Sequence, residues 1–187
     1  MSGWQGDVHL GVQAWTGEPG PEAPPEDAAA QGPEADPESV ARKLLLDTLT
    51  GQARSRQELA DKLAKKHVPD DVATRLLDRF EEVGLVDDAA FARAWIQSRA
   101  TGKGLARRAL SQELRRKGVD DETVREALEE LDPDDEREAA RALVRKRLRS
   151  MRGLDETVAT RRLVGMLARK GHSPGVAYAV VREELEH

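Results

Sequence analysis

The chain has 187 residues, 35% of them charged and only 3% aromatic, and its formal net charge at pH 7 is −5. It contains no cysteine, which excludes a disulfide framework, a thiol nucleophile and a cysteine-ligated zinc site. The amino terminus has no basic flank followed by an apolar run, and no apolar stretch approaches the roughly 20 residues that a membrane helix needs. We therefore expect a cytoplasmic protein of one domain or a few small repeated units, with no membrane association.

Charge is distributed unevenly along the chain, and the acidic part comes first. Residues 1–38 contain eight acids and no lysine or arginine, and they are rich in proline, glycine and alanine. Such a segment cannot bury enough apolar surface to offset the entropy of ordering it, so it is predicted to be a disordered tail. For Trp4 and Trp15 two interpretations stay open: incidental aromatic residues, or a short docking motif.

After this tail the apolar residues follow helical periodicity, and nothing alternates as a strand does. The first predicted helix spans 39–50 and has Val40 among its apolar positions. The second opens at Ser55, where the motif SRQE is typical of a capping box. The third begins after Pro69, carries Val83 on its apolar face and ends at a glycine.

Six more helices follow, most of them bounded by capping residues or glycines. Their predicted spans are 88–101, 104–117, 120–131, 134–151, 155–170 and a last helix that begins at 173. The first of the six is expected to bury Phe91, Ala94 and Trp95, which share one helical face. The motif SRATGKG that follows is predicted to be a glycine-bearing loop, and it holds Arg99 and Lys103.

One short motif occurs three times, as LAKKH from Leu63, LRRKG from Leu114 and LARKG from Leu167, at spacings of 51 and 53 residues. Each copy ends a second helix, and its basic residues complement the negative end of the helix dipole. A period of about 50 residues predicts a tandem array of three-helix units. The predicted divisions are the tail at 1–38 and repeats at 39–86, 87–132 and 133–187.

Two zones of this array are strongly basic, and both point to a polyanion or an acidic protein. On the helix predicted at 134–151, arginines recur at i, i+4, i+8 and i+12, where like charges repel unless a negative partner is present. The alternative is a solvated face that serves only solubility. No aromatic residues interleave with these cations, so backbone contact without base recognition is expected. The candidate binding residues are Arg99, Lys103, Arg107, Arg108, Arg115, Arg116, Lys117, Arg137, Arg141, Arg145, Arg149 and Arg152.

Two other kinds of function find little support. In a helix-turn-helix regulator the third helix of a unit would enter the major groove, but here the helices from Pro69 and at 120–131 are acidic and would be repelled. The four histidines have no nucleophile or carboxylate at a recognisable spacing, and the paired aspartates sit at helix starts, where carboxylates cap backbone N–H groups. We therefore expect no catalytic activity, no metal and no cofactor.

From Arg54 to Leu128 the sequence closely resembles the RecX family, the regulators of RecA recombinase. The resemblance lies in RSRQEL at 54–59, GLVDD at 84–88, Phe91 and Trp95 in FARAW, SR at 98–99, and KG at 117–118. The third unit matches more loosely, and the tail lies outside the resemblance. One departure is His67, which stands where the family pattern has glycine.

This resemblance implies an elongated, curved, all-α array of three three-helix repeats. It implies a monomer that binds in the groove of a RecA filament on single-stranded DNA and inhibits filament extension, ATP hydrolysis and strand exchange. Such a protein would act in DNA repair, homologous recombination and the SOS response without catalysis of its own. The alternative is a non-enzymatic helical scaffold for another acidic protein or nucleic acid.

Overall fold

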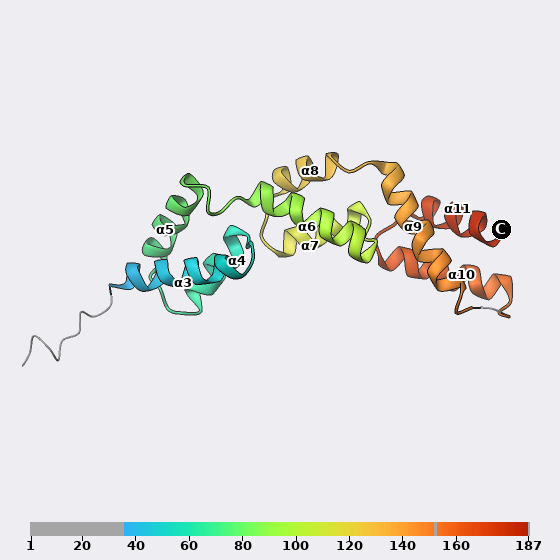
Figure 1. Ribbon diagram of the computed structural model, residues 1–187, viewed down its shortest axis with the longest axis horizontal. Coiled ribbons are helices and arrows are strands. Elements are labelled where there is room, and N and C mark those ends of the chain that lie inside the picture. Colours follow the sequence, from blue (N-terminus) through green and yellow to red (C-terminus); the bar gives the residue numbers. More distant parts are fainter. Residues whose placement is uncertain (1–35, 152, 187) are drawn as a thin grey trace, which may run out of the picture. The chain divides into compact units, whose positions relative to one another are not determined.

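The structure is a computed structural model that describes residues 36–151 and 153–186, and this part of the chain contains nine α-helices and no strand. The helices belong to one compact unit that begins at Pro37 (Figure 1). Because the first helix also begins at Pro37, the last two residues of the predicted tail are helical. Trp4, Trp15 and nearly all of the tail lie outside the described residues.

The first repeat consists of α3 (Pro37–Gly51), α4 (Arg56–Ala64) and α5 (Asp70–Glu82). The predicted capping box is confirmed, because Ser55 caps α4 and its backbone N–H meets the Glu58 carboxylate. The fully buried side chains of α3 and α4 pack against α5 and Val86. Val40 and Val83, expected on apolar faces, are instead 50% and 51% exposed, because each points away from this small core.

The second repeat consists of α6 (Asp88–Lys103), α7 (Arg107–Arg116) and α8 (Asp121–Glu129). Its core includes Phe91, but the other buried side chains of α6 are Ala92 and Ile96. The prediction that Ala94 is buried was wrong, because it faces solvent. Trp95 is half-buried and packs against the core.

The third repeat consists of α9 (Pro133–Leu148), α10 (Glu156–Arg169) and α11 (Pro174–Leu185). Ala140 and Val144 of α9 pack against Leu163 and Leu167 of α10 and against the buried valines of α11. Helix α9 ends three residues earlier than predicted, so Arg149 occupies its C-cap position. Three repeats of three helices therefore follow one another along the chain, as the 50-residue period predicted.

The motif that was expected to form a loop is helical as far as Lys103, so α6 extends two residues beyond its predicted end and contains both Arg99 and Lys103. The helix continues through Thr101, whose hydroxyl donates to the carbonyl of Gln97. It ends only at Gly104, which has a left-handed backbone with φ of 59°. The following helix, α7, accordingly starts three residues later than predicted.

The repeated motif, LRRKG in the second repeat and LARKG in the third, lies at the junctions between repeats. At the first junction the Ser55 hydroxyl donates to the Lys117 carbonyl at 2.5 Å, and the Lys117 ammonium pairs with Glu58 at 2.6 Å. At the second, the N–H of Ala106 donates to the Lys170 carbonyl at 2.9 Å. In both cases the N-cap residue of one second helix contacts the C-cap residue of the next. These lysines therefore connect repeats in addition to complementing helix dipoles.

The glycine that ends the motif is required by this close contact between neighbouring repeats. Gly171 has φ of 90°, and a Cβ atom there would lie 2.6 Å from the backbone nitrogen of Ala109 in the preceding repeat. A Cβ atom at Gly118 would likewise overlap the side chain of Gln57. His67 has the same left-handed backbone, with φ of 58°, but is exposed. The first repeat has no repeat before it among the described residues, so a side chain is sterically tolerated there.

His172 is buried at the second junction. Its Nε2 lies 3.2 Å from the Gly104 carbonyl, which can only accept, so the neutral ring carries its proton on Nε2. Its Nδ1 has no hydrogen-bond partner and lies 3.8 Å from a Glu136 carboxylate oxygen. Burial lowers the pKa of His172, against smaller opposing effects of Gly104 and Glu136 and a small reinforcing effect of Lys170.

Candidate nucleic-acid interface

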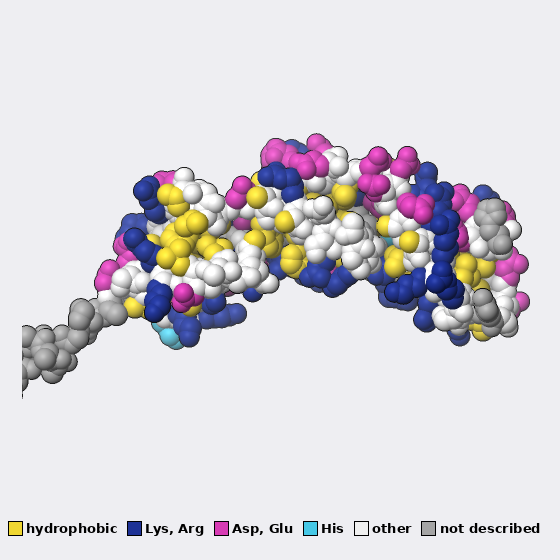
Figure 2. All heavy atoms as spheres, in the orientation of Figure 1, with side chains coloured by type: hydrophobic (Ala, Val, Ile, Leu, Met, Phe, Trp, Pro, Cys, Tyr) yellow, Lys and Arg dark blue, Asp and Glu magenta, His cyan; other side chains and the backbone are white. Residues whose placement is uncertain are grey.

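Basic and acidic side chains gather on different sides of the helical unit. Figure 2 shows lysine and arginine along one edge, beneath α4, α7 and α10, and in a band along α9. Aspartate and glutamate gather over α8 and the start of α9. The contacts of each cation decide which of them are available to a partner.

Two of the predicted binding residues enclose a tryptophan. The Arg99 guanidinium and the Lys117 ammonium each lie 4.1 Å from the ring centroid of Trp95. The indole N–H donates to Glu113 at 2.9 Å, and the ring stacks on Phe91. Because its ring is occupied in this way, Trp95 is unsuited to stack on a base.

The arginines of α7 divide into paired and free groups. Arg107 donates to the carbonyl of Leu131, and Arg115 pairs with Asp121 at 2.6 Å. Both line a cavity of about 420 Å³ between α7 and α8, which also contains carboxylates of α8. Arg116 donates only to a backbone carbonyl of its own helix. Within the described chain, the side chains of Lys103 and Arg108 make no hydrogen bond or ion pair and are exposed.

The arginine stripe on α9, formed by Arg137, Arg141, Arg145 and Arg149, is neutralised in its middle by acids of the protein itself. Arg141 pairs with Glu183 of α11 at 3.0 Å and with Glu138 at 3.3 Å, and Arg145 pairs with Glu184 at 2.8 Å. Hydrogen bonds to these carboxylates raise the pKa of both arginines. The expectation that the stripe lacks negative partners was therefore wrong for Arg141 and Arg145, because α11 packs against α9 and brings its acids within reach.

The remaining residues of this stripe differ in their surroundings. Arg137 lies 3.7 Å from Asp134 in the first turn of the same helix. Arg149 is exposed, and its side chain has no hydrogen bond or ion pair within the part of the chain that the structure describes. Arg152 lies outside the described residues.

A basic groove that we did not predict lies along α10. It is a cavity of about 570 Å³, here called the α10 groove, and it is lined by Arg147, Met151, Arg161, Arg162, Gly165, Met166 and Arg169. Its four guanidinium groups are exposed and make no hydrogen bond or ion pair with any described residue. The sequence contained a signal for it, because no acid occurs between Glu156 and Glu183.

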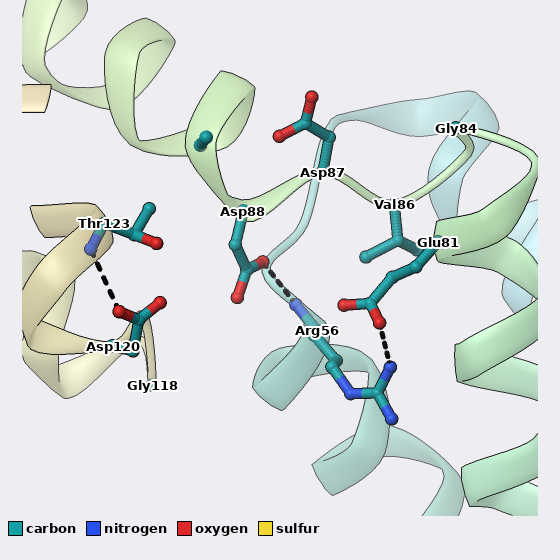
Figure 3. Close-up of a pocket in the computed structure, with 10 residues that line it drawn as sticks. Arg56, Glu81, Gly84, Val86, Asp87, Asp88, Gly118, Asp120 and Thr123 are labelled. Atoms are coloured by element: carbon teal, nitrogen blue, oxygen red, sulfur yellow. Dashed lines mark hydrogen bonds and ion pairs between the residues drawn. The ribbon is translucent and has the colours of Figure 1, made fainter. Parts of the chain in front are cut away.

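A cavity of opposite charge lies between the first and second repeats (Figure 3). It has a volume of about 550 Å³, and its acidic lining residues are Glu81, Asp87, Asp88 and Asp120. Burial raises the pKa of Asp88, and Glu81 and Asp120 add to the effect, although the backbone N–H of Arg56 donates to its carboxylate at 2.8 Å.

Two of these acids have the structural role that the sequence predicted. Asp87 caps α6, and Asp120 caps α8 by accepting from the N–H groups of Glu122 and Thr123. At α5, by contrast, Pro69 occupies the N-cap position and neither Asp70 nor Asp71 caps the helix. The described residues contain no cluster of three potential metal ligands. None of their helices is long and apolar enough to cross a bilayer.

These features define a class: a tandem array of three-helix units whose helices carry segregated charge. Three family models match it in order, described as the first, second and third three-helix domains of RecX, at residues 41–80, 87–128 and 134–181. The chain belongs to the RecX family.

Relatives support this assignment over most of the chain. A protein named Regulatory protein RecX from Thermobifida fusca is 52% identical over 170 residues, which cover 91% of this chain and 87% of the relative. A protein of the same name from Streptomyces lividans is 50% identical over 163 residues, covering 87% and 82%. One from Mycolicibacterium smegmatis is 51% identical over 150 residues, covering 78% and 79%.

Two crystal structures share the fold. RecX from Lactobacillus salivarius superimposes with a TM-score of 0.74 at 20% identity, covering 82% of this chain and 99% of that one. Another structure, described as regulatory protein RecX, superimposes with a TM-score of 0.72 at 24% identity, covering 94% and 86%. The three-repeat architecture is thus found at low sequence identity.

Proposed function

We propose that this protein regulates the RecA recombinase by binding RecA filaments on single-stranded DNA. The proposal includes inhibition of filament extension, ATP hydrolysis and strand exchange, and thereby modulation of DNA repair and recombination. The observation that carries it is the ordered match of all three RecX domain models along the chain. In this proposal the protein acts as a monomer in the cytoplasm.

The charge distribution supports such a partner. A nucleoprotein filament offers phosphates and protein surface together, and the helical unit has basic and acidic sides (Figure 2). Guanidinium groups bind phosphate oxygens through paired N–H donors, whatever the base sequence. The carboxylates of α8 would be repelled by DNA, which leaves them for contact with basic protein surface.

No catalysis by the protein itself is needed. Asp87 and Asp120, two of the carboxylates of the acidic cavity, act as helix caps. Binding alone can inhibit a filament if it hinders the motion or addition of subunits. We therefore propose that its effect on ATP hydrolysis is exerted on the ATPase of RecA.

Titration of the purified protein into RecA filaments on single-stranded DNA tests the proposal. ATP hydrolysis and strand exchange should both fall in a saturable way, and the effect should be weaker at high salt because screening reduces charge contacts. A control titration into free RecA without DNA separates filament binding from capture of the monomer. Unchanged hydrolysis and strand exchange at saturating protein would contradict the proposal and favour a helical scaffold for another acidic partner.

A further inference from the structure

We propose that the α10 groove binds the sugar–phosphate backbone of single-stranded nucleic acid and is the principal DNA contact of this protein. The inference deepens the proposed function and rests on it, because it assigns the DNA component of the filament to particular residues. The distinguishing observation is the state of the guanidinium groups. Those of the groove are unpaired within the described chain, whereas Arg141 and Arg145 of the α9 stripe are paired with acids of α11.

Free guanidinium groups have an energetic advantage in binding phosphate. A phosphate that approaches Arg141 or Arg145 has to displace Glu183 or Glu184, and the displaced carboxylate then repels it. In the α10 groove the nearest charges are all positive, and no carboxylate has to move. The α9 stripe is more conspicuous in the sequence, but the groove is the better anion site.

The spacing of the groove suits a chain of phosphates more than a single ion. Arg161, Gly165 and Arg169 recur at four-residue intervals and share one face of α10. Arg161 and Arg169 are separated by eight residues, which is about 12 Å along the helix axis. A row of cations with this backbone spacing matches an extended phosphodiester backbone, which presents several phosphates in succession, better than a single phosphate ion.

The central residue of the row has no side chain. Gly165 lies within α10, where glycine is less favourable than alanine by about 1 kcal/mol. A Cβ atom placed there would have ordinary contact, 3.6 Å from an Arg169 guanidinium nitrogen, so packing does not demand glycine. The absence of a side chain lets the Arg169 guanidinium lie close to Gly165 and leaves the groove beside it open to a ligand.

The apolar part of the lining favours a single strand over a duplex. Met166 lies half-buried beside the guanidinium groups, whereas Met151 belongs to the core beneath them. Thioether side chains make favourable contacts with aromatic rings, and an unpaired base can reach Met166 while its phosphate meets an arginine. In a duplex the bases are stacked and paired, so only phosphates would be presented to Met166.

The main test measures binding of a fluorescent oligonucleotide to the full chain as a function of salt. Changing Arg161, Arg162 and Arg169 to Gln removes three charges and retains good helix formers. We expect affinity at low salt to fall about tenfold or more, and the slope of log K against log salt to decrease by about 2 units, since each phosphate contact on a single strand contributes about 0.7.

A matched triple variant controls for net charge. Arg75→Gln, Arg79→Gln and Arg125→Gln remove the same charge from helices α5 and α8, where each arginine is paired with an acid of its own helix. This variant should bind the oligonucleotide with nearly unchanged affinity and slope. Equal losses in the two triple variants would overturn the proposal, because net charge alone would then explain binding.

A second pair of variants does not depend on removing arginines. Gly165→Glu places a carboxylate four residues from Arg161 and from Arg169, where it can form ion pairs that support the helix. Binding should fall about tenfold or more, whereas Gly165→Gln, of the same size and uncharged, should lose much less. Equal binding by the two would overturn the proposal.

Competition with unlabelled molecules identifies the class of ligand that the α10 groove binds. Unlabelled single strand should displace the probe at lower concentrations than duplex or pyrophosphate, and a polyglutamate peptide should compete poorly. If the peptide competes best, the groove binds an acidic protein segment and the proposal is overturned.

RecA inhibition is measured separately. If the α10 variants lose oligonucleotide binding while the wild-type protein fails to inhibit RecA, the assignment of the groove as the nucleic-acid site is supported and the proposed function is refuted. If the wild-type protein inhibits RecA and all variants bind the oligonucleotide normally, the proposed function stands and the groove assignment fails.

Discussion

Replacement of Gly171 by alanine tests whether close backbone approach holds the second and third repeats together. Two effects should destabilise this variant. Its φ of 90° is unfavourable for any residue with a Cβ atom, which costs about 1–2 kcal/mol. The new methyl would also lie 2.6 Å from the backbone nitrogen of Ala109, where carbon contacts normally exceed 3.4 Å, and such overpacking costs about 1–3 kcal/mol.

Relief of that overlap would also lengthen the junction hydrogen bond. The N–H of Ala106 lies 2.9 Å from the Lys170 carbonyl, and loss of such a bond costs about 1 kcal/mol. Together the effects predict that Gly171→Ala lowers the free energy of unfolding by about 3–6 kcal/mol. Urea denaturation followed by circular dichroism measures this value.

Gly84→Ala is the matched control. Gly84 has a similar left-handed φ of 73°, but a Cβ atom there would meet nothing within 4 Å. It should therefore cost only the backbone part, about 1–2 kcal/mol. If Gly171→Ala and Gly84→Ala lose the same free energy of unfolding, glycine is needed in the repeated motif only to end a helix. Our account of the junction would then be refuted.

Three further predictions concern the core, pH and the tail. Trp95→Ala should destabilise by about 3 kcal/mol, near the lower end for large-to-small changes because the ring is half-buried; an unchanged denaturation midpoint with DNA binding lost would instead mark a stacking surface. The lowered pKa of His172 keeps it neutral when folded, so stability should fall as pH drops below about 6.5, where only the unfolded chain gains the proton. His172→Gln should remove that part of the pH dependence in denaturation series, and an unchanged slope would contradict it. A truncation that begins at Pro37 should keep the helical circular dichroism and melting temperature of the full chain; a large loss of either would show that the tail supports folding.

The helical content, the repeat period and most helix ends were predictable because they depend on local signals. Ser55 and Asp87 cap helices through contacts within three residues, so their roles can be recognised from short motifs. The misplaced start of α7 shows the limit of local signals. Gly102 did not end α6, whereas Gly104 did, and a Cβ atom at Gly104 would lie 2.7 Å from Leu143 in the next repeat.

The sequence by itself determined the kind of architecture and the presence of basic zones, because apolar periodicity, caps and charge are written in neighbouring residues. Only the tertiary structure decided which cations are free. Arg141 acquires its partner from Glu183, and Lys117 from Glu58, through pairs far apart in the chain. Arg161 and Arg169 stay unpaired because no described acid is brought to them. Charge pairing between helices depends on which helices pack together, and no local pattern contains that information.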